Sequence, residues 1–149
     1  MKALHSQLLL VLRLTFLLGI FSLMSGCATK SLEAQVADNV NLKGLKTFYV
    51  KKLPADGRGI EKLIADELNS LGFKATSGAD DPSVEDYDAL ITYQDKWMWD
   101  ITMYMMELRL QVKEPKTNFV MASGHSFRNS FARESQEKMV AEVLGEVFK

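Results

Sequence analysis

Few residue types in this sequence could do chemistry. Histidine occurs only at His5 and His125, and Ser123 lies two positions before the second histidine. A serine–histidine–acid triad needs its nucleophile within hydrogen-bond reach of the imidazole. Side chains two positions apart on a strand leave the same face in parallel and do not aim at each other. We therefore expect His125 to be a surface or edge-strand residue, predict no catalytic residue, and do not expect an enzyme.

Five acidic residues are concentrated within positions 80–88: Asp80, Asp81, Glu85, Asp86 and Asp88. Carboxylates in a flexible loop can hold calcium. The spacing, however, lacks the alternating Asp/Asn pattern with a central glycine that calcium loops use. The single cysteine excludes an internal disulfide and a multi-cysteine zinc site. We predict a solvated loop, with no metal and no cofactor.

That cysteine, Cys27, follows an apolar run without charges over 14–24. A span of eleven residues (14 through 24) is too short to cross a bilayer, which takes about 20 residues. It fits the apolar region of a secretory signal, which is about 7–15 residues long. An alternative is a core cysteine at the end of a membrane helix. Arg13 within the longer apolar stretch and the abrupt polarity after Cys27 argue against that alternative.

The order Leu-Met-Ser-Gly-Cys over 23–27 resembles the lipobox of bacterial lipoproteins, with Met24 where leucine is commoner. The resemblance implies that residues 1–26 are removed and that Cys27 carries acyl chains such as palmitate, of which two or more make a stable membrane anchor. Removing 26 of 149 residues leaves a mature chain of 123. Ala28 and Thr29 follow the cysteine, and the lack of aspartate there implies the outer membrane. The domain would then face the periplasm.

Three regions are expected along the chain. They are a signal peptide over 1–26, the lipidated cysteine with a polar tether over 27–44, and one periplasmic α/β domain over 45–149. The formal charge of −1 gives no electrostatic footprint for nucleic acid, and the 47% hydrophobic content indicates a globular domain.

Apolar periodicity predicts the elements of that domain. Two-residue alternation or β-branched and aromatic runs predict strands, and spacings of three and four predict helices. The strands are expected at 47–50, 73–76, 88–93, 106–112 and 119–127, and the helices at 60–71 and 135–147. We predict an α+β fold in the order β-α-β-β-β-β-α, a mostly antiparallel sheet with both helices packed on one face.

Both tryptophans and four of the eight methionines lie within 93–106. Over 101–106 both faces of the expected strand are apolar or aromatic apart from Thr102, so one face needs a cover. A helix or the tether could cover it, or it could dock a partner protein, or it could contact the membrane interface. The candidate partner-binding patch consists of Trp97, Met98, Trp99, Met103 and Met105.

Segments 96–101 and 123–128 carry a further resemblance, to a family of small uncharacterised lipoproteins of the Gram-negative outer membrane. It implies a lipid-anchored compact α/β domain and brings no known activity. We therefore expect a non-enzymatic binding module that is held on the membrane by its anchor and contacts an envelope protein. The alternative is a periplasmic carrier or sensor with a small or lipidic ligand, and a hydrolase ranks third. Exposure of Trp97 and Trp99 would favour a partner, whereas enclosure in a cavity would favour a ligand.

Overall fold

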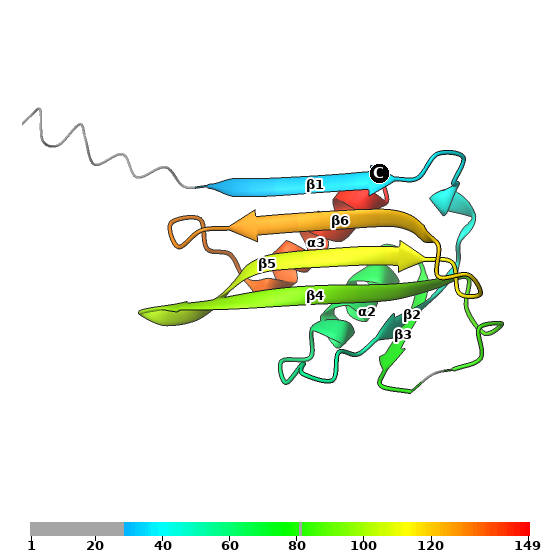
Figure 1. Cartoon of the computed structure of the whole chain (residues 1–149), viewed down its shortest axis with the longest axis horizontal. Helices are drawn as coiled ribbons and strands as arrows, with labels where there is room; N and C mark the ends of the chain where they lie inside the picture. Colours follow the sequence, from blue (N-terminus) through cyan, green and yellow to red (C-terminus); the bar gives the residue numbers. More distant parts are fainter. Residues whose placement is uncertain (1–28, 81) are drawn as a thin grey trace, which may run out of the picture.

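A computed structural model describes residues 29–80 and 82–149, so the expected signal peptide and Cys27 lie outside the described residues. One six-stranded sheet has the strand order β1-β6-β5-β4-β2-β3 (Figure 1). None of the described helices is long and apolar enough to span a bilayer. The elements are β1 (Lys30–Val36), a 3-10 turn (Leu42–Gly44), β2 (Thr47–Lys51), α2 (Ile60–Ser70), β3 (Lys74–Gly78), β4 (Ala89–Asp100), β5 (Thr102–Lys113), β6 (Val120–Arg128) and α3 (Gln136–Val147).

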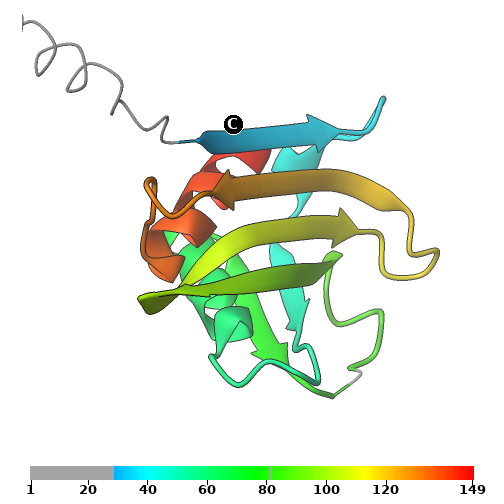
Figure 2. The ribbon, with the colours of Figure 1, turned by 60° about the vertical axis from the view of Figure 1, so that its left-hand side comes forward.

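From β2 onward the expected order β-α-β-β-β-β-α is confirmed, and both helices cover one face of the sheet (Figure 2). The sheet is mixed. Strands β1, β6, β5 and β4 pair antiparallel, while β2 runs parallel to both β3 and β4. Strands β2 and β3 can pair in parallel because α2, which lies between them in the chain, provides the crossover connection that parallel neighbours need.

The first strand corrects the expectation of a tether over 27–44 for the described part of that segment. Lys30–Val36 pair with β6 along their whole length, from Lys30 opposite Arg128 to Val36 opposite Ala122. Leu32 and Ala34 pack against the core, so alternate residues of this strand are held by the domain. The folded unit therefore begins at about residue 30 instead of 45.

The core lies between the sheet and the two helices. Helix α3 crosses close to β6 at Gly124, where an added Cβ atom would lie 2.5 Å from Val143 Cγ1 and 2.8 Å from Val147 Cγ2. Only a residue without a side chain fits beneath the helix at this point. The apolar side chains with no exposed surface come from α2, α3 and three strands: Val50, Ile60, Ile64, Leu68, Ala89, Ile91, Leu108, Val112, Met139, Val143 and Leu144.

Helix α2 begins on the buried carboxylate of Asp56. This carboxylate accepts backbone N–H groups from Arg58 (2.7 Å), Gly59 (3.0 Å) and Ile60 (2.8 Å), which a helix start otherwise leaves without partners. The Tyr93 hydroxyl donates to it at 2.7 Å and so ties the loop to β4. Burial works to raise the pKa of Asp56, but the hydrogen bonds from Tyr93 and the backbone outweigh it and lower the pKa. Burial and this carboxylate raise the pKa of Tyr93.

Candidate functional site: an open sheet face and an apolar hairpin tip

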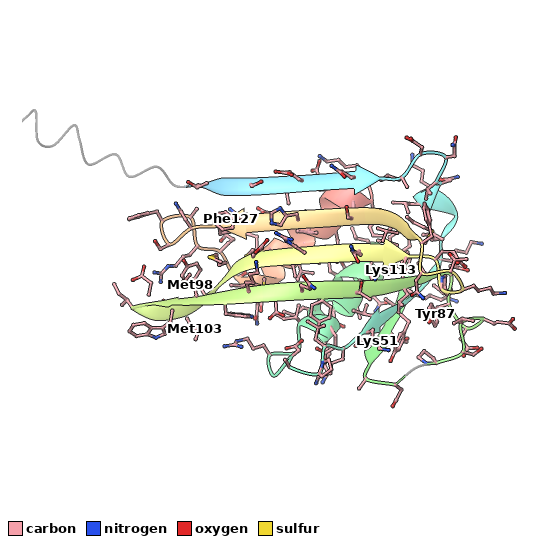
Figure 3. All side chains as sticks on the ribbon, viewed as in Figure 1. Lys51, Tyr87, Met98, Met103, Lys113 and Phe127 are labelled. Carbon is pink, nitrogen blue, oxygen red and sulfur yellow. The ribbon has the colours of Figure 1, made fainter. Side chains whose placement is uncertain are left out.

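The face of the sheet opposite the helices carries polar side chains (Figure 3). The strand register places Glu33, His125, Arg109 and Gln94 in one row across β1, β6, β5 and β4. Because side chains alternate between faces along a strand, the same alternation that buries Leu108 and Leu110 sends Arg109 to this side. We call this surface the open face.

Glu107 is the centre of a charged cluster on the open face. Its side chain is buried, with Oε2 at 2.8 Å from Lys96 Nζ and Oε1 at 2.6 Å from Arg109 Nε. His125 Nε2 lies 3.0 Å from the same Oε1 atom. The hydrogen bond from Lys96, aided by Arg109 and opposed by burial, lowers the pKa of Glu107 to about 2. The carboxylate therefore stays ionised at neutral pH and fixes the orientation of the imidazole.

His125 lies half-buried on the open face of an inner strand, since β6 is flanked by β1 and β5. It is therefore a surface residue, as expected, and not an edge-strand one. Beside it is a shallow depression of about 260 Å³, lined on the open face by Glu33, Gln35, Arg109, Gln111, Ser123 and His125. The depression presents hydrogen-bond donors and acceptors together with one anionic and one cationic side chain, Glu33 and Arg109. Such a lining suits contact with a polar surface.

Replacing Glu107 by glutamine is expected to lower the free energy of unfolding at pH 7 by about 2 kcal/mol, because three positively charged or donor groups lose their anion. Glu107 has a folded-state pKa of about 2 against an ordinary value of 4.5. Its contribution is therefore complete above pH 4.5 and is lost as the pH falls toward 2. Urea unfolding at pH 7 and pH 3 measures both effects.

The matched control is Glu33→Gln, an exposed carboxylate on the same face. Its effect is expected to be small at both pH values. A Glu107→Gln deficit that stayed constant from pH 7 to pH 3 would show that the ionised carboxylate is not the stabilising group.

The acidic segment has a structural role at one position. Asp88 Oδ2 accepts the backbone N–H groups of Lys46 (2.8 Å) and Thr47 (2.9 Å), and these bonds lower the pKa of Asp88. Asp81 lies outside the described residues. Over residues 29–80 and 82–149, no group of three or more histidine, cysteine or acidic side chains is placed to hold a metal ion.

The second surface is the tip of the β4–β5 hairpin, which projects beyond the rest of the sheet (Figures 1 and 2). Met98, Trp99 and Met103 are exposed there, as the candidate patch requires, and no described segment covers them. Ile101, which that patch did not include, is 85% exposed and occupies the turn. We call Met98, Trp99, Ile101 and Met103 the apolar tip.

Two members of the candidate patch are placed elsewhere. Met105 is buried in the core, and Trp97 packs against the core with the Arg58 guanidinium 4.1 Å from its ring centroid. Trp97 continues the inward alternation of Ile91 and Tyr93 along β4, and a shift in the pairing register between Lys96 and Trp97 sets Met105 opposite it. A bulge of this kind changes which face the following residues occupy. The expectation that Met105 belongs to an exposed patch is therefore wrong.

The loop between β6 and α3 braces the apolar tip. Arg133 donates to Thr102 Oγ1 at 2.7 Å and to the Asp100 carbonyl oxygen at 2.8 Å, and it pairs with the Asp100 carboxylate at 3.0 Å. The same guanidinium lies 4.5 Å from the ring centroid of Tyr104. Phe131, two residues earlier in this loop, is 75% exposed and adds a second exposed aromatic ring to this end.

Comparisons with known proteins extend the description of the fold. No family model matches the sequence, and no curated protein matches it. A DUF4136 family protein from Bacteroides thetaiotaomicron aligns over 78% of this chain and 93% of its own, with 12% identity and a TM-score of 0.49.

Two structures of a PelC dodecamer from Paraburkholderia phytofirmans are also similar, one of them of a point variant. The variant aligns at 12% identity over 79% of this chain and 97% of its own, with a TM-score of 0.60. The other aligns at 12% identity over 80% of this chain and 98% of its own, with a TM-score of 0.56. At this low identity the likeness concerns the fold alone, and it extends over nearly the whole PelC chain. The described part of this chain has a fold similar to that of the PelC chain.

Proposed function

We propose that this chain is a lipid-anchored lipoprotein of the bacterial outer membrane, acylated at Cys27, whose domain faces the periplasm as a non-enzymatic binding module. The observation that carries the proposal is the Leu-Met-Ser-Gly-Cys order over 23–27 behind a short apolar run. The start of β1 at Lys30 is compatible with it, because the described strands and helices all follow Cys27 and cleavage before that residue would leave them intact.

A binding role fits the two surfaces better than an enclosed ligand site does. The space between the sheet and the helices is filled by core side chains, and Trp99 is 69% exposed at the hairpin tip. The open face is a broad array of polar groups with only a shallow depression beside His125. Neither surface encloses a small or lipidic ligand, which disfavours a carrier or sensor. The polar open face is the surface that we assign to contact with an envelope protein.

The anchor is tested by Cys27→Ser in cells supplied with labelled palmitate. The wild-type chain is expected to carry the label and to fractionate with the outer membrane after washing. Cys27→Ser is expected to lose the label and to leave that fraction, since the domain alone has no acyl chains to hold it. Met24→Leu is the matched control, because it restores the commoner residue and should keep both properties.

A wild-type chain without label, or a Cys27→Ser chain that still fractionates with the outer membrane, would contradict the anchor. The binding role has a separate readout in the same cells. A photo-crosslinking residue at Gln111, exposed on the open face, is expected to capture an envelope protein. The same residue at Lys62, exposed on the helical side, should not.

A further inference from the structure

The apolar tip and the start of β1 lie at the same end of the molecule (Figures 1 and 2). Hydrogen bonds connect them through the loop between β6 and α3. The Asn129 N–H donates to the carbonyl oxygen of Thr29 at 3.2 Å, and Arg133 in the same loop binds Asp100 and Thr102 beside the tip. The chain therefore enters the domain at the same end as its most exposed apolar side chains.

The strand register shows how far the tip projects. Lys30 is level with Arg128, and Glu107 is level with Phe127, so residues 101–105 lie beyond the level of Lys30. Five residues of strand (101 through 105) span roughly 15 Å. Cys27 is three residues before Lys30, and three residues reach at most about 10 Å in any conformation. The tip thus extends at least as far from the domain as the cysteine can.

We propose that the apolar tip inserts into the interfacial region of the same bilayer that holds the anchor, so that the domain is attached at two points. The inference rests on the proposed acylation of Cys27. With the acyl chains in the membrane and so short a connection, the projecting tip meets the surface of that bilayer. Apolar side chains at such an interface are buried about 5–10 Å into the boundary between headgroups and acyl chains, a depth that the projection of the tip allows.

The side chains of the tip have the chemistry that this interface selects. Tryptophan is favoured there because its ring is apolar and its N–H is polar. Methionine and isoleucine supply flexible and branched apolar surface beside it. The nearest acidic group, Asp100, is paired with Arg133 and presents no unpaired charge to the lipid. We therefore expect the contact to be mainly apolar and only weakly dependent on salt.

The turn at the tip supports a role outside the domain. Ile101 has φ of +62°, which is strained for a branched side chain and is normally taken by glycine or asparagine. Its side chain is 85% exposed and packs little within the domain. Glycine would take this backbone conformation without strain, and the exposed isoleucine side chain adds no packing that would repay the strain. A contact between Ile101 and something outside the domain would explain why isoleucine occupies the turn.

The inference also fixes which surfaces stay accessible. Met98 and Met103 lie at the end of the molecule that faces the membrane, whereas Lys51, Tyr87 and Lys113 lie at the opposite end (Figure 3). The strand axes then run away from the bilayer surface, and the open face remains exposed to the periplasm.

The test uses the full acylated protein in vesicles of phosphatidylethanolamine and phosphatidylglycerol that contain brominated lipids. The chain has two tryptophans, so Trp97→Phe leaves Trp99 as the only emitter. We expect its emission to shift to shorter wavelength and to be strongly quenched by bromines placed near the headgroups, with little change in high salt. If Trp97→Phe fails to fold by circular dichroism, Trp97→Tyr replaces it.

The matched control moves the only tryptophan to the opposite end. Phe119 is 53% exposed in the β5–β6 turn, so the triple variant Trp97→Phe, Trp99→Phe and Phe119→Trp should show no quenching. Mass spectrometry first establishes acylation of each protein. Missing acyl chains overturn the proposed function. Acylated protein with unquenched Trp99, or equal quenching at both ends, overturns only the second attachment point.

A protein partner for the tip is separated from lipid in cells. A photo-crosslinking residue at position 101 is expected to form adducts with phospholipid. A specific protein adduct from this position would overturn the membrane contact and assign the tip to a protein partner.

Discussion

Gly124→Ala is expected to lower the free energy of unfolding by about 3 kcal/mol, although it adds one methyl group to a buried position. The new Cβ atom would stand 2.5 Å from Val143 Cγ1 and 2.8 Å from Val147 Cγ2. Both contacts are with branched side chains that are stiff in a helix, and both valines are buried. Helix α3 must therefore move away from β6, and the core side chains between the helix and the sheet lose part of their packing contacts. Chemical unfolding of purified protein measures the loss.

Gly145→Ala is the matched control within α3. An added Cβ atom there has no neighbour within 4 Å, and alanine is a better helix former than glycine. This substitution is expected to stabilise the protein by about 0.5–1 kcal/mol. The same chemical change should thus have opposite signs at two positions, and a neutral Gly124→Ala would show that α3 does not lie as close to β6 as described.

Asp56→Ala is expected to lower the free energy of unfolding by about 4 kcal/mol. The substitution leaves the N–H groups of Arg58, Gly59 and Ile60 without their acceptor, and it leaves the Tyr93 hydroxyl without the carboxylate. Hydrogen bonds to a charged acceptor contribute more than neutral ones, and unmade bonds in a buried site carry the full desolvation penalty.

Two further variants test whether the hydrogen bonds accepted by the Asp56 carboxylate cause this loss. Asp56→Asn keeps one acceptor oxygen and is expected to recover part of the stability. Asp66→Ala removes an exposed carboxylate from the middle of α2 and should change stability by less than about 0.5 kcal/mol. Equal losses for Asp56→Ala and Asp66→Ala in thermal unfolding would count against the capping role.

Regular alternation and helical spacing were sufficient to predict most of this fold from the sequence. The segment 106–112 alternates strictly and lies within β5, and the helical pattern that begins at 60 agrees with α2 (Ile60–Ser70). These elements are predictable because each buries one face of its own pattern. Strand β1 was missed because only Leu32 and Ala34 of its residues pack on the core, so its pairing with β6 decides its structure.

The candidate surfaces were only partly predictable for a similar reason. The Trp- and Met-rich segment 93–106 is visible in the composition, but its position along the hairpin is not. Trp97 and Met105 are opposite each other at the level of the core and pack inward, while Trp99 and Met103, two residues nearer the tip, stay exposed. A turn at Ile101 has no glycine or asparagine to indicate it. The Glu107 cluster joins side chains from β4, β5 and β6, which no local pattern brings together.

The edge strand β1 has a mechanical consequence if the chain is held at Cys27. A force that draws the domain away from the membrane pulls on Lys30 along the axis of β1. All seven register pairs between β1 and β6 then share the load in shear, whereas a pull across the strand would open them one after another. With the proposed anchor at Cys27, β1 is thereby oriented to resist tension, and separating it from the domain would require the whole of β1 to slide past β6 at once.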